Sequence, residues 1–179
     1  MPTDDVQTTL TTRTGEVIHL RRATPQDQAA LASFFTHVTA EDLRFRFLTG
    51  MKDVSPDRLK QMTRLDDPAI TNVLAFNEDA TLVAVAVLAG EEETHRAEVA
   101  LTIRADFKQR GISWAVLSHL CHYAARHGYQ SIESIESRAN HAAIALEKDM
   151  DFEAYDDEDD PTQVLLKRSL IRRPDTQPA

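Results

Sequence analysis

Cysteine, long apolar runs and positive charge are all scarce in this sequence of 179 residues. Cys121 is the only cysteine, so the chain cannot form an internal disulfide, and its apolar neighbours favour a packed, inert thiol over a nucleophile. No segment approaches the roughly 18 apolar residues of a membrane helix, and residues 1–12 lack the basic start and apolar run of a targeting signal. The sequence therefore predicts a soluble, cytoplasmic protein that binds no membrane.

The charge balance is acidic, with 20 Lys and Arg against 29 Asp and Glu and a formal net charge of -9. Attraction to a phosphate backbone cannot be the general principle of such a surface, so nucleic acid is not an expected partner. An acidic surface would favour cationic substrates such as amines or lysine side chains, although a solvated surface explains the same charge. Hydrophobic residues at 42% and charged residues at 27% are ordinary values for a soluble globular protein.

One domain is expected over residues 15–171, between a flexible N-terminal segment at 1–14 and a flexible tail at 172–179, because both ends are polar. Alternating apolar residues and turn signals predict strands at residues 17–22, 69–76, 82–88, 98–104, 131–136, 152–155 and 163–170. Cap residues and a period of 3.6 predict helices after Thr24, Thr39 and Ser55, and over residues 111–127 and 140–148. This order predicts a mixed α/β fold.

The most informative stretch runs from Arg104 to Trp114, where a strand end, a short loop and a helix start follow one another. The first turn of a helix has free N–H groups and the positive end of the dipole, so a pyrophosphate can dock there if side chains leave room. Gly111 would permit that approach, and Lys108 and Arg110 add positive charge. By spacing alone, a plain helix start with solvated basic residues is about as good an explanation.

This stretch resembles motif A of the GNAT acetyltransferases, Q/R-x-x-G-x-G/A, and here it reads Lys108-Gln109-Arg110-Gly111-Ile112-Ser113. Lys108 replaces the usual first residue, and Ser113 replaces the second glycine. The resemblance implies a central, mostly antiparallel sheet of about six to seven strands flanked by helices, with acetyl-CoA as the acyl donor. It implies that the donor is bound by Leu101, Thr102, Ile103, Lys108, Gln109, Arg110, Gly111, Ile112, Ser113, Trp114 and Asn140.

A second stretch, Asn140 to Phe152, is similar to the family pattern N-x-x-A-x-x-L-Y-x-x-x-G-F. Glu147 stands where the family often has the tyrosine proposed to protonate the leaving thiolate, and Asp151 stands where it has glycine. The sequence therefore assigns no general acid.

Residues 39–47 and 97–101 look like parts of the acetyltransferase module of bacterial protein lysine acetyltransferases, and this likeness implies that Glu98 is the catalytic base. An ammonium group must lose a proton before it attacks a thioester, and a partly buried carboxylate with a raised pKa can accept that proton. The alternative is an exposed strand glutamate. His119 and His122 lie three residues apart on one helix, but no Cys, Asp or Glu on that helix completes a metal site, so no metal and solvent-facing histidines are expected.

These observations predict an acetyl-CoA-dependent N-acetyltransferase of the GNAT type, an acyltransferase whose acceptor is a primary amine, either a small molecule or a protein lysine. The departures at Ser113, Glu147 and Asp151 keep open a second reading, a GNAT-like module that binds CoA or a protein partner without turnover. A transferase for a longer acyl group would need a wider acyl pocket, which sequence cannot show. A homodimer is left open.

Overall fold

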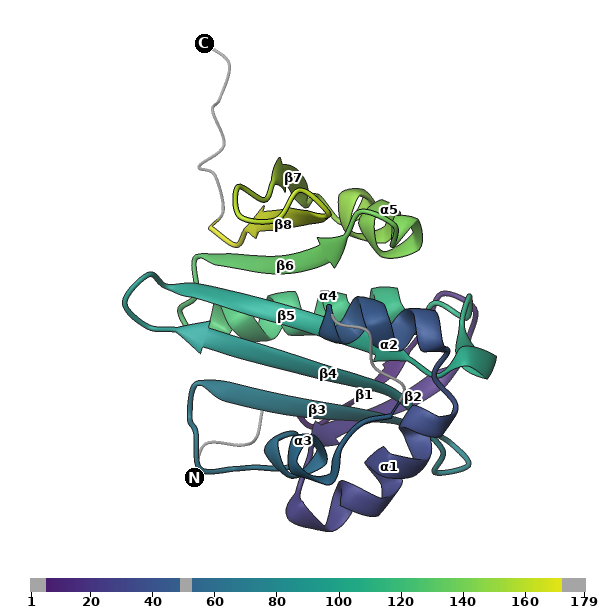
Figure 1. The fold of residues 1–179 in the computed structure, drawn as a ribbon. Helices are drawn as coiled ribbons and strands as arrows, with labels where there is room; N and C mark the ends of the chain where they lie inside the picture. Colours follow the sequence, from purple (N-terminus) through teal and green to yellow (C-terminus); the bar gives the residue numbers. More distant parts are fainter. Residues whose placement is uncertain (1–5, 49–52, 172–179) are drawn as a thin grey trace.

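The computed structural model describes residues 6–48 and 53–171, which form one sheet with helices on both faces (Figure 1). The strands are β1 (Thr8–Thr11), β2 (Val17–Arg22), β3 (Ile70–Asn77), β4 (Leu82–Glu91), β5 (Arg96–Ile103), β6 (Ser131–Ser137), β7 (Glu153–Asp156) and β8 (Gln163–Ser169). The α-helices are α1 (Gln28–Thr36), α2 (Ala40–Phe47), α3 (Pro56–Gln61), α4 (Ile112–Arg126) and α5 (His141–Asp149). Two short 3-10 helices, η1 (Pro25–Asp27) and η2 (Ala105–Phe107), precede α1 and the loop before α4.

The sheet has the strand order β1-β2-β3-β4-β5-β6-β8-β7, and its neighbours are antiparallel except for the parallel pair β5 and β6. This confirms the predicted mixed α/β fold with a mostly antiparallel sheet and all of the predicted strands and helices. The sheet has eight strands rather than the six to seven expected.

The additional strand is β1, which lies in the segment expected to be flexible. Thr8 to Thr11 pair with β2 in antiparallel register, from Thr8 opposite Leu20 to Thr11 opposite Val17. The threonines that made this segment look unstructured are compatible with an edge strand, because β-branched side chains fit a pleated surface. Residues 1–5 and the predicted flexible tail at 172–179 lie outside the described part of the chain.

The helix starts follow the predicted cap residues. Thr39 Oγ1 accepts the backbone N–H of Asp42 at 3.1 Å, and Ser55 Oγ accepts that of Arg58 at 3.3 Å. Thr24 precedes η1, and its backbone N–H donates to Asp27 Oδ2 at 2.7 Å. Each contact satisfies a backbone group that a helix end would otherwise leave open, so these positions fix where the helices begin.

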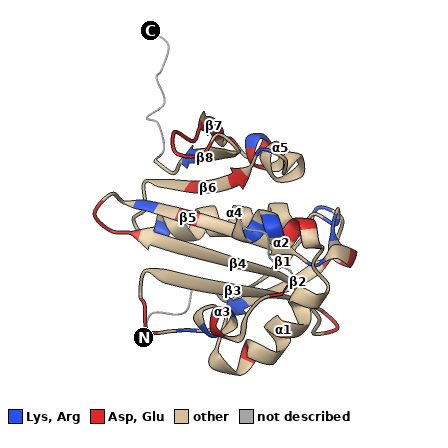
Figure 2. Cartoon of the chain, in the orientation of Figure 1, with Lys and Arg blue, Asp and Glu red and all other residues tan. Residues whose placement is uncertain are grey.

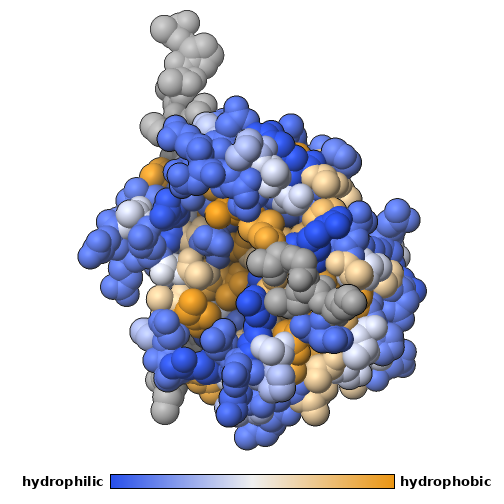
Figure 3. All heavy atoms as spheres, in the orientation of Figure 1, coloured by the Kyte–Doolittle hydropathy of each residue, from blue (hydrophilic) through white to orange (hydrophobic). Residues whose placement is uncertain are grey.

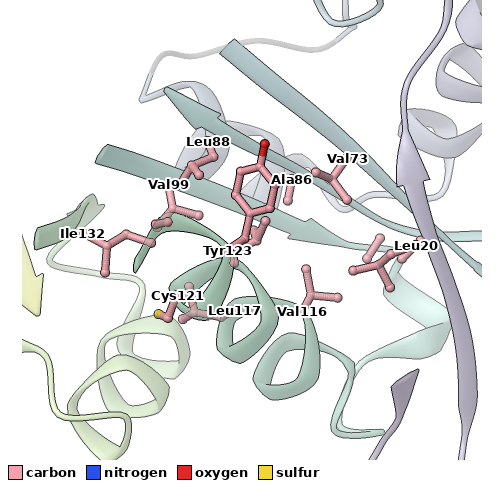
Figure 4. Close-up of a cluster of buried hydrophobic side chains, with 14 of the residues drawn as sticks. Leu20, Val73, Ala86, Leu88, Val99, Val116, Leu117, Cys121, Tyr123 and Ile132 are labelled. Carbon is pink, nitrogen blue, oxygen red and sulfur yellow. The ribbon is translucent and has the colours of Figure 1, made fainter. Parts of the chain in front are cut away.

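Two apolar clusters hold the helices against the sheet. In the larger one, Val116, Leu117 and Leu120 of α4 pack on one face of the central strands (Figure 4). The smaller one joins α1, α2 and α3 to the opposite face. Alternation along β3 serves both clusters, because Val73 and Leu74 face opposite sides of the sheet.

Cys121 is buried in the larger cluster, as expected of a packed thiol, and burial raises the pKa of its thiol. His122 is exposed as predicted, whereas His119 on the same helix is half-buried rather than solvent-facing. The packing around α4 therefore sets the exposure of His119, which the spacing of the two histidines did not predict.

Candidate functional site

A cleft opens where β5 and β6 stop pairing. Their parallel register covers only three pairs, from Arg96 opposite Ser131 to Glu98 opposite Glu133. Beyond this point β5 stays bonded to β4 and β6 stays bonded to β8, so the two strands separate and the backbone of Val99–Ile103 loses its β6 partner. A cavity of about 510 Å³ fills the space between them, with walls from β5, β6, α2, α4 and α5. Figure 3 shows apolar residues in a hollow on this face.

A buried glutamate joins three strands at the closed end of the cleft. Glu133 of β6 is only 8% exposed at its side chain, and its Oε1 accepts Lys167 Nζ of β8 at 2.9 Å while Oε2 lies 3.5 Å from Arg96 Nη1 of β5. Two cations on neighbouring strands compensate the buried charge. This arrangement holds the strands together just before they separate.

The backbone at the start of α4 is arranged to receive an anion. Gly111 has φ of +77°, in the left-handed region, and Gln109 also has a positive φ of 61°. The first helical hydrogen bond of α4 runs from the N–H of Ala115 to the carbonyl of Gly111 at 3.1 Å, so the amides of the preceding turn are available to a ligand. Of the residues predicted to bind the donor here, the cavity is lined by Lys108, Gln109, Gly111, Ile112, Ser113 and Trp114.

The two basic residues of this loop are both engaged with carboxylates. Lys108 Nζ forms an ion pair with Asp42 of α2. Arg110 Nη1 lies 3.5 Å from Glu16 Oε1, and Arg110 Nη2 donates to the carbonyl of Asp106 at 2.9 Å. Arg110 does not line the cavity. The loop is therefore less positive than its sequence suggests.

The turn between β1 and β2 packs against this loop. Thr14 Oγ1 donates to the carbonyl of Arg110 at 2.6 Å, and the guanidinium carbon of Arg13 lies 3.6 Å from the centroid of the Trp114 ring. A Cβ on Gly111 would meet Thr12 Cβ at 3.3 Å. Sequence reasoning missed this support, because the contacts join residues about a hundred positions apart.

The strand beside the cleft carries the predicted donor-binding residues Leu101, Thr102 and Ile103, and all three line the cavity. Thr102 is 5% exposed, and its hydroxyl oxygen is buried without a hydrogen-bond partner among the described residues. A buried hydroxyl without a partner is rare in folded proteins.

Glu98, the predicted base, is the last residue of β5 that pairs with β6. Its side chain is exposed, and Glu98 is not among the residues that line the cavity. The partial burial expected of it is therefore wrong. Arg46 of α2 does line the cavity and interacts electrostatically with Glu98 and Glu136, while burial lowers the pKa of its guanidinium. Figure 2 shows basic residues on α2 and acidic residues on β6.

Two carboxyl groups meet inside the cleft, on β6 and α5. Glu147 is 5% exposed, Glu136 is half-buried, and the two side chains are close enough to interact electrostatically. Ser134 Oγ also donates to Glu147 Oε2. The pKa of Glu147 is raised to about 8, chiefly by burial and also by the neighbouring Glu136, while the hydrogen bond from Ser134 opposes the shift. Sequence reasoning saw Glu147 only as a departure from the pattern.

Burial likewise raises the pKa of Glu136 to about 7, against the opposing effects of the Asn140 hydrogen bond and the Arg46 charge. Asn140 Nδ2 donates to Glu136 Oε2 at 2.9 Å, and Asn140 Oδ1 accepts the N–H of Ala143 at 3.4 Å as the cap of α5. Asn140 also lines the cavity, so its position agrees with the predicted site. Asp151, in the glycine position of the pattern, adopts φ of 65° and so keeps the turn that glycine would make.

Comparison with known proteins identifies the family to which this fold and cleft belong. The profile of the Acetyltransferase (GNAT) family matches residues 34–152, which include β5, the loop, α4, β6 and α5. The chain belongs to the GNAT family of acetyltransferases. Acetyl transfer is therefore its general activity, and the residues of the cleft belong to a GNAT acetyltransferase domain.

Three similar proteins place this GNAT chain among its relatives. "Acetyltransferase PA5475" of Pseudomonas aeruginosa is 29% identical over 159 residues, which cover 87% of this chain and 86% of that protein. The GNAT domain of S. lividans PAT superposes with a TM-score of 0.86 at 19% identity, covering 94% of this chain and 99% of the other. Spermidine N-acetyltransferase from Vibrio cholerae, solved with CoA and spermine, has a TM-score of 0.68 at 14% identity, covering 84% and 92%.

Two further properties of the described residues concern membranes and metals. Within residues 6–48 and 53–171, no helix is both long and apolar enough to cross a bilayer. The same residues contain no group of three or more His, Cys, Asp and Glu placed to hold a metal ion.

Proposed function

We propose that this protein transfers an acetyl group from acetyl-CoA to a primary amine, and that a lysine side chain of a protein is the acceptor. The observation that carries the proposal is the cleft between β5 and β6, which opens onto the free amides at the start of α4. A linear thioester with an anionic end fits such a site, because one end needs anion-binding amides and the other needs an open strand edge.

The residues present fit acetyl-CoA. The amides around Gly111 would hold the pyrophosphate, and the open edge of β5 at Leu101, Thr102 and Ile103 would bond the amides of the pantetheine arm. When bound, acetyl-CoA would supply an activated acyl carbon, and a strand amide would polarise its carbonyl oxygen.

Glu98 is proposed to accept the amine proton. Its place in the last β5–β6 pair puts an exposed carboxylate at the point where the two strands separate, and this exposure lets a water molecule relay the proton. A mobile lysine of another protein can reach an exposed carboxylate. The likeness to the GNAT domain of a PAT protein and the net charge of -9 both favour a cationic acceptor.

The test measures CoA release from acetyl-CoA with a panel of amines, including lysine-containing peptides, free polyamines and amino acids. Glu98→Gln should lower kcat by about 10²-fold or more, because a general base contributes on the order of 10² to 10⁴. Exposed Glu93 on the loop between β4 and β5 provides the matched control Glu93→Gln, which should leave the rate unchanged. Unchanged activity in Glu98→Gln removes the proposed base.

Calorimetry with CoA separates this proposal from its alternative, a module that binds CoA or a partner without catalysis. Binding without turnover across the whole amine panel supports the module. Ser113, which lines the cavity in place of a glycine, motivates the alternative together with Glu147 and Asp151. Ser113→Gly should tighten CoA binding if its side chain crowds the phosphate, and should leave binding unchanged if it does not.

A further inference from the structure

The cleft contains few groups that can release a proton. Among the described residues, the titratable ones that line it are Asp42, Arg46, Lys108, Glu136 and Glu147, and this described lining includes no Tyr, Cys or His. Asp42 and Lys108 are engaged with each other in an ion pair. An arginine does not deprotonate in proteins. Glu136 and Glu147 are therefore the remaining source of a proton inside the cleft.

The geometry of these two residues keeps one proton between them. Both carboxyl groups lie in the wall of the cleft close enough to interact, and two ionised carboxylates side by side in a buried site repel each other, so one of them carries a proton. Each carboxyl group already accepts one hydrogen bond from a neighbour: Ser134 Oγ donates to Glu147, and Asn140 Nδ2 donates to Glu136 at 2.9 Å. The shared proton therefore lies between the two carboxyl groups. Removing that proton would place two negative charges side by side in a buried site.

The surroundings decide which carboxyl holds the proton. Arg46 of α2 interacts with Glu136, and that positive charge favours the ionised form of Glu136. Glu147 is the more deeply buried of the two; the hydroxyl of Ser134 donates to it, and the thiol of Cys121 on α4 interacts with it electrostatically. The protonated carboxyl is therefore that of Glu147, which donates to the Glu136 carboxylate.

We propose that Glu147, held protonated by Glu136, is the proton donor of the transfer reaction. This inference rests on the proposed function. As the carbon–sulfur bond of the thioester breaks, the sulfur keeps the electron pair and takes the proton from the Glu147 carboxyl. The Glu136–Glu147 pair is left with two negative charges. The amine nitrogen gives up one proton to Glu98 before it attacks and a second proton as it becomes an amide, and this second proton restores the pair. No proton is gained or lost overall by the pair.

The first experiment observes the proton in the protein alone. Carbon NMR of protein labelled at the glutamate carboxyl carbon should show one carboxyl that stays protonated at neutral pH. That signal should disappear in Glu147→Gln and persist in Asp149→Asn, which makes the same chemical change at an exposed position of α5. If every glutamate titrates near the ordinary value of about 4.3, the proposal is overturned whether or not the enzyme is active.

The second experiment varies the need for a proton donor. With acetyl-CoA, Glu147→Gln should lower kcat by about 10²-fold or more, as expected for the loss of a general acid. With the acetyl thioester of an acidic aryl thiol, whose thiolate leaves without a proton, the same variant should retain most of the wild-type rate. An equal loss with both donors contradicts proton donation and assigns Glu147 a structural role.

The pH profile gives a third readout that a structural role would not move. In the wild type, kcat should fall at alkaline pH as the pair loses its proton. Glu136→Gln removes the like charge beside Glu147, so the pKa of Glu147 falls and the alkaline limb of kcat moves to lower pH. An alkaline limb unmoved by this substitution overturns the pairing. Absence of wild-type turnover would instead contradict the proposed function and leave the NMR result to decide on the proton.

Discussion

The two ends of the cleft differ in how far apart their residues lie in the sequence. At the α4 end, the features that matter are contiguous in the chain: a strand end, a loop with Gly111, and a helix start. At the α5 end, Glu136 and Glu147 come from different elements and meet only because β6 and α5 pack together. The first end offers amides and a helix dipole, and the second offers a proton. The comparison teaches that anion binding is a local property here, whereas proton storage is a tertiary one.

The largest expected effect concerns the pH dependence of stability at the α5 end. The folded-state pKa of Glu147 is raised to about 8, above the ordinary value, so the folded protein holds a proton that the unfolded chain releases. The resulting stability is complete below about pH 4 and is lost as the pH rises through about 8. The free energy of unfolding should fall by about 2 to 4 kcal/mol between pH 5 and 9.

Glu147→Gln should flatten that dependence, because the amide imitates the protonated carboxyl: it can accept from Ser134 and donate to Glu136. Denaturant unfolding across the pH range measures this directly. At about pH 9 the variant should be more stable than the wild type. If Glu147→Gln loses the same stability at every pH, the α5 end of the cleft does not store a proton on Glu147.

A substitution outside both ends separates fold stability from site chemistry. Asp27 Oδ1 and Oδ2 accept from Arg21 at 2.7 and 2.8 Å, and this contact lowers the pKa of Asp27 to about 2. Asp27→Asn should cost about 2 kcal/mol near neutral pH. The wild type should lose this stability as the pH falls through about 2, and the variant should not. CoA affinity measured by calorimetry should stay at the wild-type value; a weakened affinity would link η1 to the cleft.

The α4 end can be tested through its backbone. Gly111→Ala places a Cβ at a φ of +77° and 3.3 Å from Thr12 Cβ, which should cost roughly 1 to 2 kcal/mol and displace the loop amides. The Kd for CoA should rise about tenfold. Gly128→Ala is the matched control, because it has φ of +86° at the other end of α4 and nothing within 4 Å. It should cost similar stability without changing the Kd, and an equal change in both would deny a special role to Gly111.

The smallest expected effect concerns the charge of the same loop. Asp42→Asn removes the partner of Lys108 and should release that ammonium to an incoming phosphate. Exposed ion pairs are worth about 0.2 to 1 kcal/mol, so CoA affinity should improve about two- to fivefold. Asp106→Asn, whose carboxylate pairs with Arg104 instead, should leave the affinity unchanged. Weaker binding in Asp42→Asn would mean that Asp42 positions the loop rather than neutralising it.

Most of the fold could be predicted because its signals are local. Thr39 and Ser55 cap helices by contacts to residues three positions away, and alternation along β5 marks a strand whatever lies beside it. β1 escaped prediction because four threonine-rich residues form a strand only against β2. Arg110 was expected at the donor site for its charge, yet Glu16 and the Asp106 carbonyl hold it away from the cavity.

The sequence by itself determined the order of elements, the glycine before α4 and the acidic net charge, since these depend on neighbouring residues or on composition. Only the tertiary structure decided that β5 and β6 separate after Glu98 and that the β1–β2 turn supports the loop at Gly111. It also decided that the carboxyl groups of Glu136 and Glu147 lie next to each other in the cleft wall. The reason is physical: burial and charge proximity are properties of packed elements, and no local pattern encodes them.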